Sequence, residues 1–264
     1  MLKKLSTIVW LTAMCGAPVS AEAQSRAPQS IASAVRVVVD QTRPQSSTRR
    51  MLAKLAAKVT GGFRGIIGSS DRISLELTPP SGHCALSKEG EQEKEIYAGL
   101  EKLGDGKSKV FQYSVPCKQL PAFWQGKPMS KWAIYTLSSS ALPQEATRTA
   151  LVAEITKTLP EFKKSEIDKL MKQSSSTELT GIIDVTPDAV FLATVTRDEQ
   201  SSGAMGLITG ITSITLLNNR VVGLNLFADY VNIKTIDDLL ADVKEATAKS
   251  INATEAKGTQ AKPK

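Results

Sequence analysis

The chain has 264 residues, of which 41% are hydrophobic and 22% charged, and its formal net charge is +7. This composition is typical of a globular protein, because it is too apolar for a chain that is disordered throughout and too polar for a membrane bundle. One histidine and three cysteines argue against most metalloenzymes and against every histidine-rich metal site. We therefore expect neither a metal nor a cofactor.

Residues 1–23 have the three-part pattern of a secretory signal peptide. Two lysines are followed by a mainly apolar segment, residues 5–17, and Ala21-Glu22-Ala23 has the small–x–small form of a signal-peptidase site. The apolar run is shorter than the ~20 residues that a membrane-spanning helix needs. We predict an exported protein, periplasmic or secreted. An uncleaved anchor and a lipid on Cys15 are the less favoured alternatives.

Residues 24–70 form a strongly basic arm. They contain eight basic residues and a single acid, so their net charge of +7 equals that of the whole chain. Residues 1–23 carry +1, which leaves −1 for residues 71–264. The positive charge therefore belongs to the arm and not to the predicted folded body.

An amphipathic helix is predicted at residues 48–59 of the arm. Apolar residues recur there at helical spacing, the cationic residues lie mostly off that stripe, and Gly61-Gly62 ends the helix. The residues that would engage a membrane or partner are Arg49, Arg50, Met51, Lys54, Leu55, Lys58 and Phe63. One interpretation is a surface helix attracted to anionic lipid, and the other is a helix packed on the body. Nucleic acid is disfavoured as a partner because aromatic residues do not alternate with the basic ones.

The body, residues 71–252, alternates between strand and helix patterns. Strands are predicted at 73–77, 109–115, 132–137, 179–185, 189–196, 211–217 and 220–227. Helices are predicted at 89–103, 118–125, 143–158 and 166–172, and from the capping residue Thr235 onward. Ser165 with Asp168 resembles a capping box, and Asn218-Asn219 suits a tight hairpin turn. The tail, residues 253–264, is predicted to be disordered.

The last predicted hairpin indicates that the sheet is covered on both sides. Alternation places Ile214, Leu216 and Val221 on one face and Val222, Leu224 and Leu226 on the other. An antiparallel sheet with one wet face would alternate cleanly between apolar and polar residues. The predicted fold is therefore an α/β (α+β) sandwich, a mainly antiparallel sheet covered by three or four helices and preceded by the basic arm.

The mature chain keeps two cysteines, Cys84 and Cys117, in a compartment where disulfides persist. Pairing them closes a loop of about 32 residues and stabilises the fold by roughly 3–4 kcal/mol. Reduced thiols, or a zinc or nucleophilic site with His83, are the alternatives. Adjacent side chains in extended chain point to opposite faces, which hinders joint use of His83 and Cys84. We favour the disulfide, with His83 as a loop residue beside it.

A family resemblance is carried by the hairpin TLLNNRVVGLNLF at 215–227, followed by a short loop and a terminal amphipathic helix. This arrangement resembles the end of PsbP-type domains. The loop PPSGHC at 79–84, with Cys117, is similar to uncharacterised exported proteobacterial proteins. The likeness covers residues 71–252 and rests on pattern rather than on a diagnostic motif. It implies an accessory or binding role and carries over no catalytic residue.

The sequence does not match the catalytic motifs that it partly resembles. Gly106-Lys107-Ser108 imitates the end of a phosphate-binding loop, but Glu101 stands where the first glycine belongs, and the segment follows a helix instead of a strand. A Ser-His-Asp triad would have to use the single histidine, His83. Asp184 and Asp188 flank a predicted turn and are interpreted as surface residues. No catalytic residue is predicted.

Three function hypotheses follow. The leading one is an exported, non-enzymatic binding or accessory module that contacts an envelope protein through its sheet edge or through a loop containing Gly203, Gly206 and Gly210 as a pocket rim. The second is a protein that associates with an anionic membrane surface through helix 48–59. The third is an uncharacterised hydrolase. The identity of a small-molecule ligand stays open.

Overall fold

The computed structural model describes residues 75–102, 108–127, 129–138, 141–142, 144–172, 177–199 and 205–260. Its helices are α3 (Glu91–Lys102), η2 (Cys117–Gln119), α4 (Leu120–Trp124), α5 (Arg148–Thr158), η3 (Lys164–Glu166), α6 (Ile167–Met171) and α7 (Ile233–Gln260). Its strands are β1 (His83–Ala85), β2 (Ser108–Pro116), β3 (Lys131–Ser138), β4 (Thr177–Val185), β5 (Ala189–Glu199), β6 (Met205–Leu217) and β7 (Arg220–Asp229).

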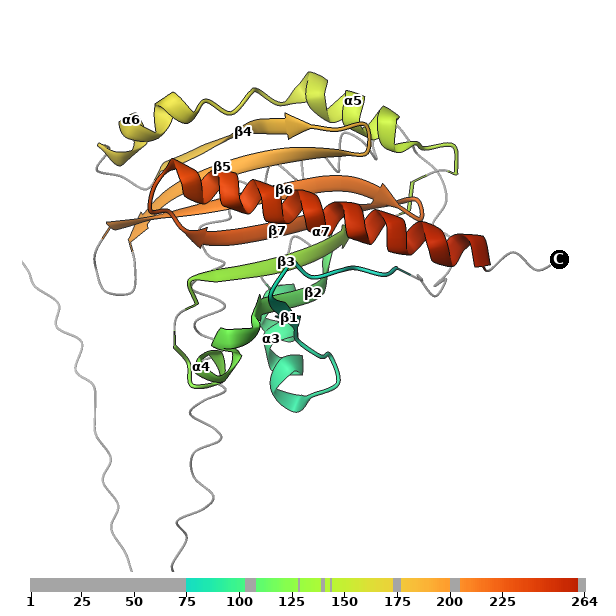
Figure 1. Ribbon diagram of the computed structural model, residues 1–264, viewed down its shortest axis with the longest axis horizontal. Coiled ribbons are helices and arrows are strands. Elements are labelled where there is room, and N and C mark those ends of the chain that lie inside the picture. The colour runs from blue at the N-terminus through green and yellow to red at the C-terminus, as the bar shows by residue number, and fades with distance from the viewer. Residues whose placement is uncertain are drawn as a thin grey trace, which may run out of the picture.

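The seven strands form one antiparallel sheet in the order β1-β2-β3-β7-β6-β5-β4 (Figure 1). The β4–β5 and β6–β7 hairpins are those predicted from sequence. Asn218 and Asn219 join β6 to β7 with φ angles of 45° and 58°, the left-handed conformations that a two-residue hairpin turn requires. The mixed α/β fold with a mainly antiparallel sheet is therefore confirmed.

One face of the sheet, here the α7 face, is covered by the long C-terminal helix, which lies across β5, β6 and β7 (Figure 1). Helix α6 lies beside it and contributes Ile167 and Leu170 to the same core. The strand residues of this core include Tyr135, Phe191, Val195, Ile211, Leu217, Leu224 and Leu226. This cluster is the largest of three in the described part of the chain.

The opposite face, here the α5 face, carries two separate apolar clusters. Helices α3 and α4 cover Tyr113, Trp132 and Phe227 with side chains such as Ile96 and Phe123. Helix α5 covers a second group on β4, β5 and β6. Its buried members from the sheet are Ile182, Val190, Leu192, Ile214 and Leu216. The predicted distribution of the β6 and β7 side chains over two buried faces is thus confirmed.

The strand predicted at 73–77 is wrong for residues 75–77, the part that the structure describes. These residues do not join the sheet but run along the C-terminal half of α7. The Glu76 amide donates to Thr254 Oγ1 (3.4 Å), and the Thr78 amide donates to Ser250 Oγ (2.9 Å). The alternating leucines at 75 and 77 pack on the α7-face core. Alternation of apolar and polar residues indicates an extended backbone, but it does not indicate which element forms the backbone hydrogen bonds with it.

Two predicted helix starts also need correction. Helix α5 begins at Arg148 and not at residue 143, because Thr147 is extended and its hydroxyl accepts from the Ala150 amide (3.2 Å). The capping box proposed at Ser165 is absent, since the 3₁₀ turn η3 leads directly into α6 and no side-chain cap bond is formed. A 3₁₀ turn at the start of a helix supplies hydrogen bonds for backbone groups of the first turn through its tighter i to i+3 pattern.

Helix α7 is longer at both ends than the sequence suggested. It starts at Ile233, where Asn232 Oδ1 accepts from the Lys234 amide (3.0 Å), so Thr235 lies inside the helix and is not its N-cap. It continues to Gln260, which overturns the predicted disorder for residues 253–260. Thr254 in this extension is buried beside the 75–78 segment. Residues 261–264 lie outside the described part.

Candidate functional site

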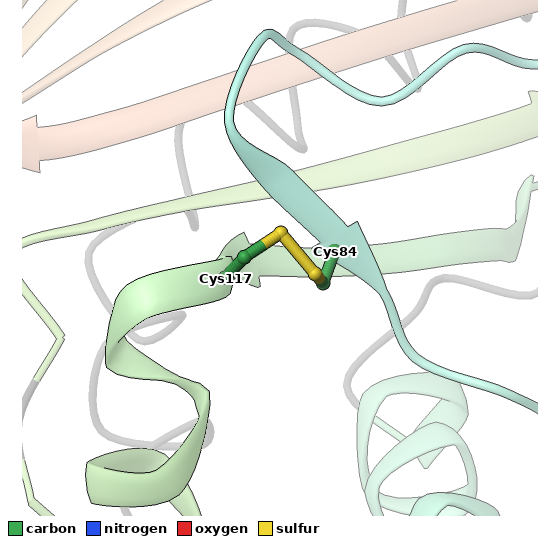
Figure 2. Close-up of a disulfide and its surroundings, with 2 residues drawn as sticks. All are labelled: Cys84 and Cys117. Atoms are coloured by element: carbon green, nitrogen blue, oxygen red, sulfur yellow. A yellow bond between two sulfur atoms is a disulfide. The ribbon is translucent and has the colours of Figure 1, made fainter.

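Cys84 and Cys117 form a disulfide, as predicted (Figure 2). Cys84 lies in β1 and Cys117 opens η2, with Cα atoms 4.9 Å apart. The Cys117 amide also donates to the Gly82 carbonyl (2.9 Å), in a turn where Gly82 has a φ of +72°. The bond therefore joins a three-residue edge strand to the end of β2.

His83 lies in β1, opposite Pro116, and not in a loop as expected. Burial lowers the pKa of His83 to about 4, and the nearby positive charge of Lys131 acts in the same direction. The imidazole is therefore neutral at pH 7. Lys131 is itself paired with Asp242 of α7, which ties β3 to the long helix beside His83.

Buried polar atoms gather around His83 on the α7 face. Nδ1 of His83, Nε2 of Gln112 and Oγ of Ser114 are buried and have no hydrogen-bond partner among the described residues. Strand register places all three on the same side of β1 and β2. Nearby, Tyr135 Oη donates to the Thr78 carbonyl (2.6 Å). Nε2 of Gln112 can donate, and the imidazole and the Ser114 hydroxyl can each donate and accept. Ser114 is fully buried, so its hydroxyl does not face a substrate here.

The glycines predicted as a pocket-rim loop lie elsewhere. Strand β6 begins at Met205, so Gly206 and Gly210 are strand residues, and Gly203 is outside the described residues. The Phe227 ring occupies the space above Gly210, with two ring carbons 2.6 Å from where a Cβ would stand. Gly210 therefore allows close packing across the β6–β7 pair.

The predicted sheet-edge site is also restricted. At one edge, β1 has only three residues. At the other, the segment after α5 pairs with β4: Phe162 donates its amide to the Ile182 carbonyl (2.7 Å), and the Ile182 amide donates to Pro160 (2.8 Å). Gly181 permits this approach, since a Cβ there would lie 2.6 Å from the Phe162 nitrogen. The centre of β4 is thus already paired.

An exposed apolar surface, here the apolar corner, consists of Met171, Val231 and Ile233. Their exposed fractions are 45%, 78% and 40%. Two hydrogen bonds connect the end of α6 with the loop between β7 and α7. Arg197 of β5 donates to the Met171 carbonyl, and Arg197 is paired in the sheet with Leu207 of β6. The Leu207 carbonyl in turn accepts from the Tyr230 amide. In Figure 1 both α6 and the start of α7 lie toward the left end of the sheet.

Sequence reasoning missed the apolar corner. Loops that join a strand to a helix are normally polar, and the run Val231-Asn232-Ile233 breaks that pattern. That run was the available signal. Met171 could not be found in this way, because an apolar residue at the end of a short helix reads as part of the core. The corner adjoins the start of β6, next to the glycines that were singled out.

The predicted membrane or partner residues of the arm all lie outside the described residues, as does the signal peptide. They are Arg49, Arg50, Met51, Lys54, Leu55, Lys58 and Phe63. Within the described ranges, His, Cys, Asp and Glu side chains do not gather in groups of three that could hold a metal ion. The helices of the same ranges include none that is both long and apolar enough to cross a membrane.

No protein-family model matches the chain, and no curated protein sequence matches it. The resemblance to PsbP-type domains therefore remains a prediction.

Proposed function

We propose that this chain is an exported, disulfide-stabilised binding module that contacts a partner protein in the cell envelope through its apolar corner. The observation that carries the proposal is the exposure of three large apolar side chains, Met171, Val231 and Ile233, on two segments that lie toward the same end of the sheet. Apolar side chains that cluster on a surface mark interaction sites more often than scattered ones do.

The surroundings of the corner support a preformed contact surface. Ile236 and Leu239, in the next turn of α7, are buried in the α7-face core, and Leu170 fixes α6 to the same core. The exposed side chains therefore project from elements that are already ordered. A partner that covers them gains apolar burial without the cost of ordering these elements. The Cys84–Cys117 bond supports the export part of the proposal, because such bonds persist outside reducing compartments.

A site-specific photocrosslinker tests the proposal in the native envelope. Benzoylphenylalanine replaces Val231 in one strain and Val185 in another. Val185 is a matched control, because it is a valine 40% exposed at the end of β4, away from the corner. We expect a discrete light-dependent adduct from position 231 that is absent from position 185. We expect the adduct to be lost when Ile233→Glu is added.

Two results would count against the proposal. One is the same adduct from both positions, which indicates non-specific collision. The other is the absence of any adduct at 231 while the protein is present and folded in the envelope fraction. Cleavage of the signal is checked in the same samples by N-terminal sequencing, where a chain that begins at Met1 contradicts export with cleavage.

A further inference from the structure

The α5 face has two rows of residues between its two apolar clusters that contain threonines, a glycine, two acids and Ile208, here called the threonine strip. Strand register places Glu178, Thr196, Ile208 and Asp229 in one row across β4, β5, β6 and β7. The next row contains Thr180, Thr194 and Gly210. Both rows lie toward the end of the sheet that is distant from the turn between β6 and β7.

The strip is well buried for a surface of this kind. Thr194 and Thr196 are each 7% exposed. The apolar side chains that α5 contributes pack on Val190, Leu192 and Ile214, nearer the other end of the strands. Those of α3 and α4 pack on Trp132 and Phe227, with Ile208 at the border. The apolar clusters that the described helices form therefore flank the strip.

We propose that residues 51–59 of the arm lie across the threonine strip as a helix, with the apolar stripe of Met51, Leu52, Leu55, Ala56 and Val59 facing the sheet. The sizes agree, because four strands about 4.8 Å apart span ~14 Å, and nine helical residues at 1.5 Å each extend ~14 Å. The short threonine side chains keep the β4 and β5 part of the strip shallow, so a helix can approach these strands closely, while Ile208 and the Phe227 ring over Gly210 give it apolar contacts on β6 and β7. The proposal is independent of the partner site at the apolar corner.

Charge complementarity selects this segment as the occupant. The strip is bordered by two acids, Glu178 and Asp229, at opposite ends of one row. At 100° per residue, Arg49 and Lys58 flank the apolar stripe on its two sides, whereas Arg50 and Lys54 point away from the sheet. A helix with this arrangement places cations beside the acids of the strip and leaves two others in solvent.

The connecting chain is long enough to reach. The first described residue, Leu75, packs on the α7-face core, on the opposite side of the sheet. Fifteen residues, 60–74, separate Val59 from Leu75 in sequence. At up to ~3.4 Å per residue they span about 50 Å, several times the ~10 Å between packed layers. The segment can therefore pass around the sheet to the α5 face.

Thermal unfolding of the full mature chain, without lipid, gives the first test. Leu55→Asp places a charge on the apolar stripe, and Ala57→Asp places the same charge on the opposite side of the predicted helix. We expect Leu55→Asp to lower Tm by at least 5 °C and Ala57→Asp to change it by less than 2 °C. Equal and small changes in both variants would overturn the proposal, since a free or lipid-seeking arm does not stabilise the body in solution.

Zero-length carbodiimide coupling on the unsubstituted mature chain gives the second test, which does not depend on how a variant folds. We expect a peptide pair that joins Lys58 to Glu178 or Asp229. An equal mixture of ¹⁴N- and ¹⁵N-labelled protein shows whether the pair lies within one chain. Coupling between chains would overturn the proposal in favour of a second copy as the occupant. Coupling of Lys58 to acids all over the body, with no preference for these two, would overturn it in favour of an undocked arm.

Discussion

His83 is the residue at which the chemistry of this protein can be followed most directly, because it is the chain's single histidine. Its imidazole is half-buried between β1 and the Lys131–Asp242 pair. The adjacent Ser114 and Gln112 leave polar atoms without partners among the described residues. A neutral ring can accept a hydrogen bond in that setting, whereas a protonated ring adds a second positive charge beside Lys131.

Stability is predicted to fall as the pH falls through the range in which His83 titrates when unfolded. The folded pKa of about 4 is below the usual value of 6.5, so between these values the unfolded chain binds the extra proton. The contribution is complete above pH 6.5 and is lost toward pH 4. With allowance for solvent screening at a partly exposed group, we expect a loss of about 1–2 kcal/mol between pH 7 and pH 5.

Urea unfolding of the mature protein at pH 7 and pH 5 measures this difference. His83→Gln removes the titrating group and keeps a neutral hydrogen-bonding side chain. The variant should lose most of the pH dependence in this window. An unchanged slope in the variant would assign the effect to carboxylates and not to His83.

Gly181 gives a second prediction for a single residue. A Cβ at this position would lie 2.6–2.8 Å from backbone atoms of Glu161 and Phe162, so Gly181→Ala must push the covering segment away from β4. We expect a loss of about 1–3 kcal/mol in the free energy of unfolding. Thr180→Ala, on the same strand, serves as the control with a smaller effect. Equal stability of wild type and Gly181→Ala would show that the segment does not hold the edge.

Individual elements show what could be read from sequence. The strands of both hairpins were predictable because alternating apolar residues and Asn218-Asn219 are local signals. The disulfide followed from compartment and cysteine count. By contrast, residues 75–77 were wrongly assigned to the sheet. The partners of this segment could not be found from local sequence, because Thr254 (bound by Glu76) and Ser250 (bound by Thr78) lie more than 170 positions away. The apolar corner was missed in part because Met171, at the end of a short helix, is indistinguishable by pattern from a core residue.

Reduction of the disulfide is predicted to release an element and not to unfold the domain. Strand β1 pairs with β2 over three residues, and the large α7-face core lies on other strands. Without the bond β1 is held to β2 only by its three-residue pairing, so the loss of protection is expected at this edge. Hydrogen exchange with and without a thiol reductant should show faster exchange at residues 80–86 and unchanged exchange in β5–β7. Uniform acceleration throughout the sheet would contradict a local release.

The whole molecule combines a basic arm with a nearly neutral body. Residues 24–70 carry +7, and residues 71–264 carry −1. If the arm helix packs on the α5 face, its apolar stripe is used within the molecule, while Arg50 and Lys54 still face solvent. The two interpretations of the arm then predict different lipid binding. A helix that is packed on the body can still be attracted to an anionic membrane surface through its outward cations, but it cannot insert its apolar stripe into the lipid.

Vesicle sedimentation distinguishes these cases. Each outward cation is worth about 1 kcal/mol near an anionic bilayer, so we expect weak binding of the mature chain that fades as salt shortens the screening length below ~10 Å. Arg50→Glu with Lys54→Glu should abolish it, and Ala57→Ser is a neutral control on the same side. Tight, salt-resistant binding that depends on Leu55 would instead show that the helix inserts into lipid.

The way in which the sheet ends has a consequence for the protein at high concentration. Open strand edges invite addition of a strand from another molecule, which is the first step of polymerisation. Here one outer strand is three residues long and covalently held, and the other is paired at its centre with residues 160–162. Addition of a strand at these two stretches therefore requires that the chain first lose its own cover there. The two covered stretches of edge therefore favour solubility when the protein is concentrated.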